Sequence, residues 1–146
     1  MRSLVADDDP VCRQAMADWV SSWGFQTLLA GDGVEALRIL RAPDPPPLVI
    51  LDWNMPRLDG FEVCRMIRES PGGDGTYILL VTGARGREEI MKVIVAGADD
   101  YLAKPIEPID LKIRLRTAVR VLHMQAELRA LRASASPVAS GEKGRP

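Results

Sequence analysis

The sequence lacks the features that mark secreted, membrane-spanning or strongly charged proteins. It has no run of about 18 apolar residues, the length that a membrane helix needs, and its first residues, MRSLVADDD, contain no long apolar stretch of a signal peptide. Nineteen basic and twenty acidic side chains leave a net charge of -1, so no overall field attracts nucleic acid or an anionic membrane. We therefore expect a cytoplasmic protein, without direct nucleic-acid binding or membrane association, that acts through a local site.

Cysteine and histidine are also scarce. The two cysteines, Cys12 and Cys64, stand apart without the paired spacing of a zinc site, and we interpret them as thiols that form no disulfide. The single histidine, His123, falls on an expected helix, where a lone histidine usually faces solvent instead of carrying phosphate or binding metal. These patterns argue against a zinc centre, a disulfide scaffold and a kinase-type histidine.

Five short apolar segments alternate with segments of helical periodicity. In the first helical segment Val11, Ala15 and Trp19 recur every four residues, which gives the helix one apolar face. Strand and helix repeated with short connections predict an α/β fold, a doubly wound parallel sheet with helices on both faces. The expected strands cover residues 3–6, 25–30, 48–51, 77–81 and 101–103.

The last expected helix begins at Pro108 and is extended beyond the rest of the fold. Past its inward-facing part, apolar residues continue at spacings of three and four on a displaced face, as in a coiled-coil seam. These residues are Val121, Met124, Leu128 and Leu131. We predict an α/β domain over residues 1–122, an extension over 123–133 that is either a coiled coil or a linker, and a disordered tail over 134–146.

Polar side chains follow four of the five expected strands. The carboxyl ends of parallel strands meet at one edge of the sheet, where ligands bind. Three carboxylates gathered there repel one another unless a cation lies between them, and Mg²⁺ takes carboxylates together with a phosphate oxygen. A lysine and a hydroxyl suit the same phosphate. The residues expected at this edge are Asp7, Asp8, Asp52, Thr82 and Lys104, whereas Asp9 is interpreted as a helix cap.

Four motifs around these residues resemble those of the receiver domains of two-component response regulators, the CheY-like family. LVADDDP resembles the family's acidic motif, DWNMPRLDG its phosphoacceptor motif, VTG its hydroxyl motif and GADDYLAKP its lysine motif. They occur in the family's order, and the resemblance covers about residues 1–122. It implies a flavodoxin-like or CheY-like fold whose five parallel strands are ordered 2-1-3-4-5.

The resemblance also implies a role for each residue at this edge. Asp52 would accept a phosphoryl group from the phosphohistidine of a sensor histidine kinase or a phosphotransfer protein, and Lys104 would pair with the phosphoryl oxygens. Mg²⁺ would be bound by the side chains of Asp8 and Asp52, by the backbone carbonyl of Asn54, and by Asp7 either directly or through a bound water.

Thr82 and Tyr101 match the family's switch pair, in which the phosphate draws the hydroxyl inward and the aromatic ring follows. The surface that changes, formed by helix four, strand five and helix five, would control an output. Some charges on this surface match positions that cross a homodimer interface in winged-helix regulators, but such charges are also typical of a solvated face. Both interpretations stay open for Lys92, Asp100, Asp110 and Arg114.

Two other functions compete with this phosphorelay switch. A phosphotransferase of the haloacid dehalogenase type also uses Mg²⁺ and a strand-end aspartate, but it needs an aspartate two residues later as general acid, where this chain has Asn54. An interaction module that is never phosphorylated would not need the complete set of site residues. We therefore predict a switch that catalyses only its own phosphorylation and dephosphorylation and is not a turnover enzyme.

Overall fold

The computed structural model describes residues 1–83 and 86–143, with side chains described as far as residue 135. Five parallel strands form one sheet in the order β2-β1-β3-β4-β5, which confirms the predicted order. The strands are β1 (Arg2–Ala6), β2 (Gln26–Ala30), β3 (Leu48–Asp52), β4 (Tyr77–Thr82) and β5 (Asp100–Ala103). Each differs by a single residue from the apolar segment that predicted it.

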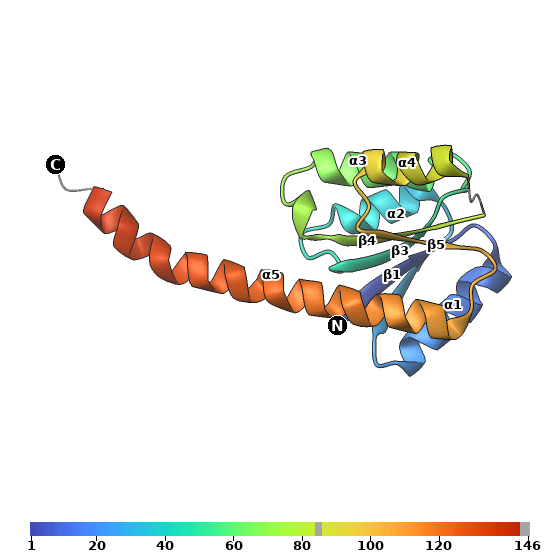
Figure 1. Ribbon diagram of the computed structural model, residues 1–146, viewed down its shortest axis with the longest axis horizontal. Helices are drawn as coiled ribbons and strands as arrows, with labels where there is room; N and C mark the ends of the chain where they lie inside the picture. The colour runs from blue at the N-terminus through green and yellow to red at the C-terminus, as the bar shows by residue number, and fades with distance from the viewer. Residues whose placement is uncertain (84–85, 144–146) are drawn as a thin grey trace.

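Helices cover both faces of the sheet, as the alternating pattern predicted (Figure 1). α2 (Gly33–Leu40), α3 (Gly60–Glu69) and α4 (Arg87–Ala96) lie on one face, and α1 (Pro10–Ser22) and α5 (Pro108–Lys143) lie on the other. The buried apolar side chains divide into two clusters in the same way. Within the described ranges, no helix has both the length and the apolar character required to cross a lipid bilayer.

β3 shows how the sequence builds both halves of the core. All five of its residues are buried, and successive side chains of a strand point to opposite faces of the sheet. Val49 and Leu51 therefore pack into the cluster that faces α2, α3 and α4, whereas Leu48 and Ile50 pack into the cluster that faces α1 and α5. The strand ends in a carboxylate, Asp52, at the edge of the sheet that the sequence predicted as the site.

α5 packs on the sheet only along its first part. Its inward-facing residues Leu111, Leu115, Ala118 and Leu122 are buried, and the rest of the helix projects beyond the sheet, as expected for an extended last helix (Figure 1). The structure differs from the expected tail, because α5 continues to Lys143 and includes residues 134–143. The sequence argument considered only burial, and residues 134–143 offer few apolar side chains to bury. Residues 144–146 lie outside the described ranges.

Candidate functional site

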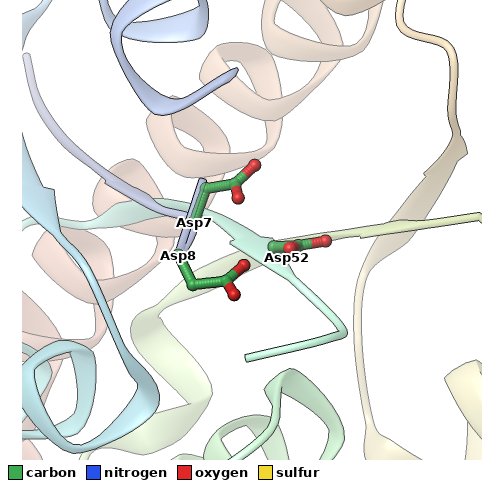
Figure 2. Close-up of side chains that lie close together, drawn as sticks. All are labelled: Asp7, Asp8 and Asp52. Atoms are coloured by element: carbon green, nitrogen blue, oxygen red, sulfur yellow. The ribbon is translucent and has the colours of Figure 1, made fainter. Parts of the chain in front are cut away.

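Three aspartates converge at the carboxyl edge of the sheet (Figure 2). Asp7 and Asp8 directly follow β1, and Asp52 is the last residue of β3, the strand beside β1. One carboxylate oxygen of each residue lies within 4.8 Å of the others. Asp7 and Asp52 are buried, whereas Asp8 is exposed. The cluster predicted from strand ends therefore exists, and it opens to solvent on the side of Asp8.

Lys104 supplies a positive charge to this cluster. Its Nζ atom lies 3.1 Å from Asp52 Oδ1 and 3.8 Å from Asp7 Oδ2. The side chain follows β5, and its backbone N–H donates to Thr82 O at 2.8 Å, so the end of β5 is tied to the end of β4. The Lys104 side chain thus reaches across β4 to β3, at the carboxyl edge where the sequence predicts it.

Thr82 and Tyr101 lie on β4 and β5, the two strands that follow β3 in the order of the sheet. Thr82 is buried and ends β4, next to Val81, which pairs with Asp52. Tyr101 is half-buried on β5, where it pairs with Leu80 and packs against the cluster that faces α4. The two residues therefore lie on adjacent strands between the acidic cluster and the face formed by α4 and β5.

The loop between β3 and α3 is held close to the end of β3. Trp53 N–H donates to Val81 O and Gly60 N–H donates to Trp53 O, both at 2.8 Å. A Cβ atom on Gly60 would overlap with the carbonyl oxygen of Asp52, so only glycine allows this approach. Asp59 caps α3 in a reciprocal capping box with Glu62, which fixes where the loop ends.

The electrostatic surroundings oppose the charge of Asp52. Burial, the largest cause, and the negative charges of Asp7 and Asp8 together raise the pKa of Asp52 to about 6, and Lys104 offsets only part of this effect. Burial by itself would lower the pKa of Lys104, but its hydrogen bond and charge interaction with Asp52 outweigh burial and raise that pKa. The group therefore holds three carboxylates and one ammonium, and a bound cation would relieve the repulsion.

The donor set fits a hard divalent cation. Asp7 Oδ2 is buried and accepts no hydrogen bond from the described residues, so it has an oxygen lone pair available for a metal. Asp8 is exposed beside it, and carboxylate oxygens are the ligands that Mg²⁺ prefers. This arrangement is consistent with the acidic pocket for Mg²⁺ that the sequence predicts.

The sequence matches the Response regulator receiver domain family over residues 4–116. The chain belongs to the response regulator receiver domain family. Response regulator MprA of Mycobacterium avium (strain 104) is 44% identical over 120 residues, which cover 82% of this chain and 51% of that protein. The receiver domain of the Francisella response regulator 1452 matches with a TM-score of 0.73 and 30% identity, over 86% of this chain and 98% of that one. Thermotoga maritima DrrB, an OmpR/PhoB homolog, matches with a TM-score of 0.73 and 28% identity, over 82% of this chain and 52% of that one.

A receiver domain is a phosphorelay switch and not a conventional enzyme, so the predicted class of function is confirmed. Family membership and the acidic pocket favour this function over the haloacid dehalogenase and non-phosphorylated alternatives. The chain spans about half the length of the curated relatives that it matches.

Two residues near the acidic pocket of this receiver were not predicted from the sequence. Arg13 Nη1 donates to the backbone carbonyl of Asp7 at 2.9 Å, and the Cys12 thiol lies close enough to Asp7 that burial and that carboxylate together raise the thiol pKa to about 11. Both follow the helix cap Asp9, whose side chain accepts from Val11 N–H. Their positions in the first turn of α1 could have indicated that both residues lie near the site, because that turn begins beside the acidic cluster.

Two of the four charged residues on the predicted dimer face, Asp100 and Arg114, form an ion pair with each other within the chain. Arg114 Nη1 lies 3.2 Å from Asp100 Oδ1, so α5 is tied to β5 in the single chain. Lys92 on α4 and Asp110 on α5 are exposed. The pairing of Asp100 with Arg114 therefore does not require a second copy.

Proposed function

We propose that this receiver accepts a phosphoryl group on Asp52. The observation that carries the proposal is the position of one Asp52 oxygen, buried at the end of β3 and 3.1 Å from the Lys104 ammonium. A nucleophilic carboxylate next to a fixed cation and two further carboxylates is suited to phosphoryl transfer. Other carboxylates of the chain, such as Asp59, serve as helix caps.

In the proposed reaction, a carboxylate oxygen of Asp52 forms a bond to phosphorus while the bond from phosphorus to the imidazole nitrogen of a phosphohistidine breaks. The released imidazole takes up a proton. Charge is spread over the three remaining phosphoryl oxygens during the transfer, and Lys104 is placed to donate to one of them. Asp52 must be ionised to react, which its raised pKa of about 6 permits at neutral pH.

Mg²⁺ would be bound by the side chains of Asp7, Asp8 and Asp52 and by the backbone carbonyl of Asn54. Bound there, the ion would offset the charge of the carboxylates and of the phosphoryl oxygens. Asp7 supports this role because its Oδ2 atom is buried and accepts no hydrogen bond from the described residues.

The signal would leave the site through Thr82 and Tyr101 to the surface of α4, β5 and α5. Reversing a switch from about 1:99 to about 99:1 needs roughly 5.5 kcal/mol of differential binding, whereas one hydrogen bond to a charged group contributes about 1.5 to 3 kcal/mol. Thr82 alone is too weak, so we assign the switch to Thr82 and Lys104 acting on the same phosphoryl group.

The phosphodonor would be a sensor histidine kinase or a phosphotransfer protein, and the changed surface would control an output in the same or another chain. Homodimerisation through α4, β5 and α5 is part of this proposal. Asp100 and Arg114, paired within the chain at 3.2 Å, would then exchange partners across the two-fold axis, with Lys92 and Asp110 at the margin.

Incubation with a small phosphoramidate and Mg²⁺, followed by mass spectrometry of the intact protein, tests the proposal. Wild-type protein should gain one phosphoryl group, and Asp52→Asn should gain none. Asp59→Asn is the matched control, because it removes a carboxylate of the same loop while asparagine still caps α3. Equal labelling of Asp52→Asn would contradict the assignment of Asp52.

A further inference from the structure

The projecting part of α5 carries an apolar seam on one side. Val121, Met124, Leu128 and Leu131 follow one another at spacings of three, four and three residues, the a and d positions of a coiled coil. The exposed fractions of Met124, Leu128 and Leu131 are 57%, 48% and 68%. Figure 1 shows that this part of the helix lies beyond the sheet. A contiguous apolar strip of this kind on a soluble domain marks an interaction surface.

The seam is distinct from the side of α5 that packs on the sheet. Leu115, Ala118 and Leu122 are buried in the core, whereas Val121 lies at the margin of that core and begins the seam. A helix with one apolar side and no packed neighbour gains little stability in water, because most helical stability comes from packing. The seam therefore needs a partner with a matching apolar strip.

The charges beside the seam indicate which partner fits. With Val121 and Leu128 at a positions, Glu127 occupies a g position and Arg132 the following e position. Both side chains are exposed. Five residues apart on one helix, they point to different sides and do not pair. In a parallel coiled coil, however, a g residue of one helix faces the following e residue of the other.

We propose that α5 pairs with α5 of a second copy of this chain as a parallel, in-register, two-stranded coiled coil. The apolar seams of the two helices face each other, and Glu127 of each copy lies opposite Arg132 of the other. An antiparallel pair would instead bring the two Glu127 side chains together and the two Arg132 side chains together, which is repulsive. The proposal rests on α5 and is independent of phosphoryl transfer to Asp52.

Sedimentation equilibrium of the full chain over a range of concentrations tests the seam, with and without Mg²⁺ and beryllofluoride. Wild-type protein should form a dimer in at least one of these conditions, and Leu128→Asp should abolish that dimer. Ala130→Asp is the matched control, because it places the same charge on an exposed position off the seam and should leave the dimer intact. A monomer in every condition, or a dimer insensitive to Leu128→Asp, would overturn the proposal.

Charge exchange tests the orientation. Glu127→Arg and Arg132→Glu should each weaken dimerisation by about tenfold, since each creates two like-charge contacts. The double variant should restore wild-type affinity, because in a parallel dimer each new arginine then faces a glutamate of the other copy. An antiparallel wild type already pairs like charges, so the single variants would not weaken that arrangement in this way. Failure of the double variant to recover would therefore contradict the parallel register.

Asp52→Asn separates this inference from the proposed function. If wild-type protein dimerises without beryllofluoride, Asp52→Asn should dimerise too. Leu128→Asp and the charge exchanges should then weaken the Asp52→Asn dimer as they weaken the wild-type dimer. A protein that dimerises through the seam but is not phosphorylated would refute only the proposed function. A protein that is phosphorylated on Asp52 but remains monomeric would refute only the coiled coil.

Discussion

Asp52 carries its charge where the surrounding protein opposes it. The side chain is 2% exposed, and its pKa of about 6 reflects burial and the charges of Asp7 and Asp8 more than the attraction of Lys104. The folded protein therefore stores unfavourable electrostatic energy at this residue. The same arrangement makes the site attractive to a divalent cation.

Replacing Asp52 with asparagine should stabilise the metal-free protein. The folded pKa of about 6 lies above the ordinary value of 3.8, so ionised Asp52 destabilises the folded state fully above about pH 6 and not at all well below pH 4. We expect Asp52→Asn to raise the free energy of unfolding by on the order of 1 to 3 kcal/mol near pH 7, with the gain vanishing near about pH 3. Urea unfolding at both pH values measures it, and an asparagine variant no more stable than wild type at neutral pH would contradict it.

Mg²⁺ affinity should fall as the pH is lowered through the pKa of Asp52. Protonation near pH 6 removes the charge that Mg²⁺ requires, so below about pH 6 the apparent affinity should decrease by up to tenfold for each pH unit. Titration with Mg²⁺ followed by tryptophan fluorescence measures the effect. An affinity that stays constant between about pH 7 and about pH 5 would show that Asp52 does not bind the ion.

At the residue scale, the sequence indicated which side chains gather at this edge and that the three carboxylates repel one another, but not the size of that effect. Asp7, Asp52 and Lys104 could be placed because each follows an apolar strand, and parallel strands end at one edge. The raised pKa depends on distances and burial that no spacing specifies. The first turn of α1 places Arg13 near the site, but its particular contact with the Asp7 carbonyl depends on the conformation of a flexible side chain, which the sequence does not specify.

Among the elements, α3 is anchored at its end by one side chain. Arg68 donates to Gly97 O, Gly73 O and Thr76 O, each at 2.7 Å, and its guanidinium lies 2.7 Å from Asp99 Oδ2. It therefore joins α3 to the 3-10 helix η1 (Gly73–Gly75) and to the turn between α4 and β5.

Removing the Arg68 guanidinium should lower the free energy of unfolding much more than removing the neighbouring Arg65 guanidinium. Arg68→Ala would leave partly buried carbonyl groups without their donors, and we expect a loss of about 2 to 4 kcal/mol in the free energy of unfolding. Arg65→Ala is the control, because Arg65 is exposed and its guanidinium contacts only Glu69, at 3.6 Å, and the Phe61 ring, at 5.9 Å from the centroid, among the described residues. Its loss should lower the free energy of unfolding by under about 1 kcal/mol. Chemical denaturation of both variants measures the difference, and equal losses would contradict the anchoring role of Arg68.

Strands and helices were predictable from periodicity, since each has one or two buried faces. The segment SPGGDG, residues 70–75, has the composition of a flexible turn, yet it contains η1. Its order depends on Arg68, which lies outside the segment. Local composition identifies glycine-rich turns, but it cannot reveal a donor supplied by another element.

For the whole molecule, the central feature is the division between the receiver and the projecting helix. Among the residues whose side chains are described, Leu122 is the last buried one on the inward side of α5, and the domain boundary predicted from the sequence lies at the same residue. The sequence predicted that the helix outruns the domain, because the apolar spacing continues on another face. It did not predict helix over residues 134–143, where no burial pattern guides the assignment.

Truncation after residue 122 should separate the two parts. The shortened chain keeps both core clusters, so we expect its melting temperature and its response to beryllofluoride to remain close to those of the full chain. Any dimer that depends on Leu128 should be lost. A truncated chain that fails to fold would place the boundary beyond residue 122, and circular dichroism melting distinguishes these results.

The most direct test of the receiver account is the fluorescence of Trp53 on addition of Mg²⁺ and beryllofluoride, which imitates a phosphoryl group. Trp53 follows Asp52, and its ring centroid lies 5.7 Å from that of Phe61, so a change at Asp52 should alter its emission. We predict a saturable change in wild-type protein that requires both Mg²⁺ and beryllofluoride, and that is absent from Asp52→Asn and from Trp53→Phe. An unchanged spectrum in wild-type protein, or an equal response from Asp52→Asn, would contradict phosphoryl acceptance at this site.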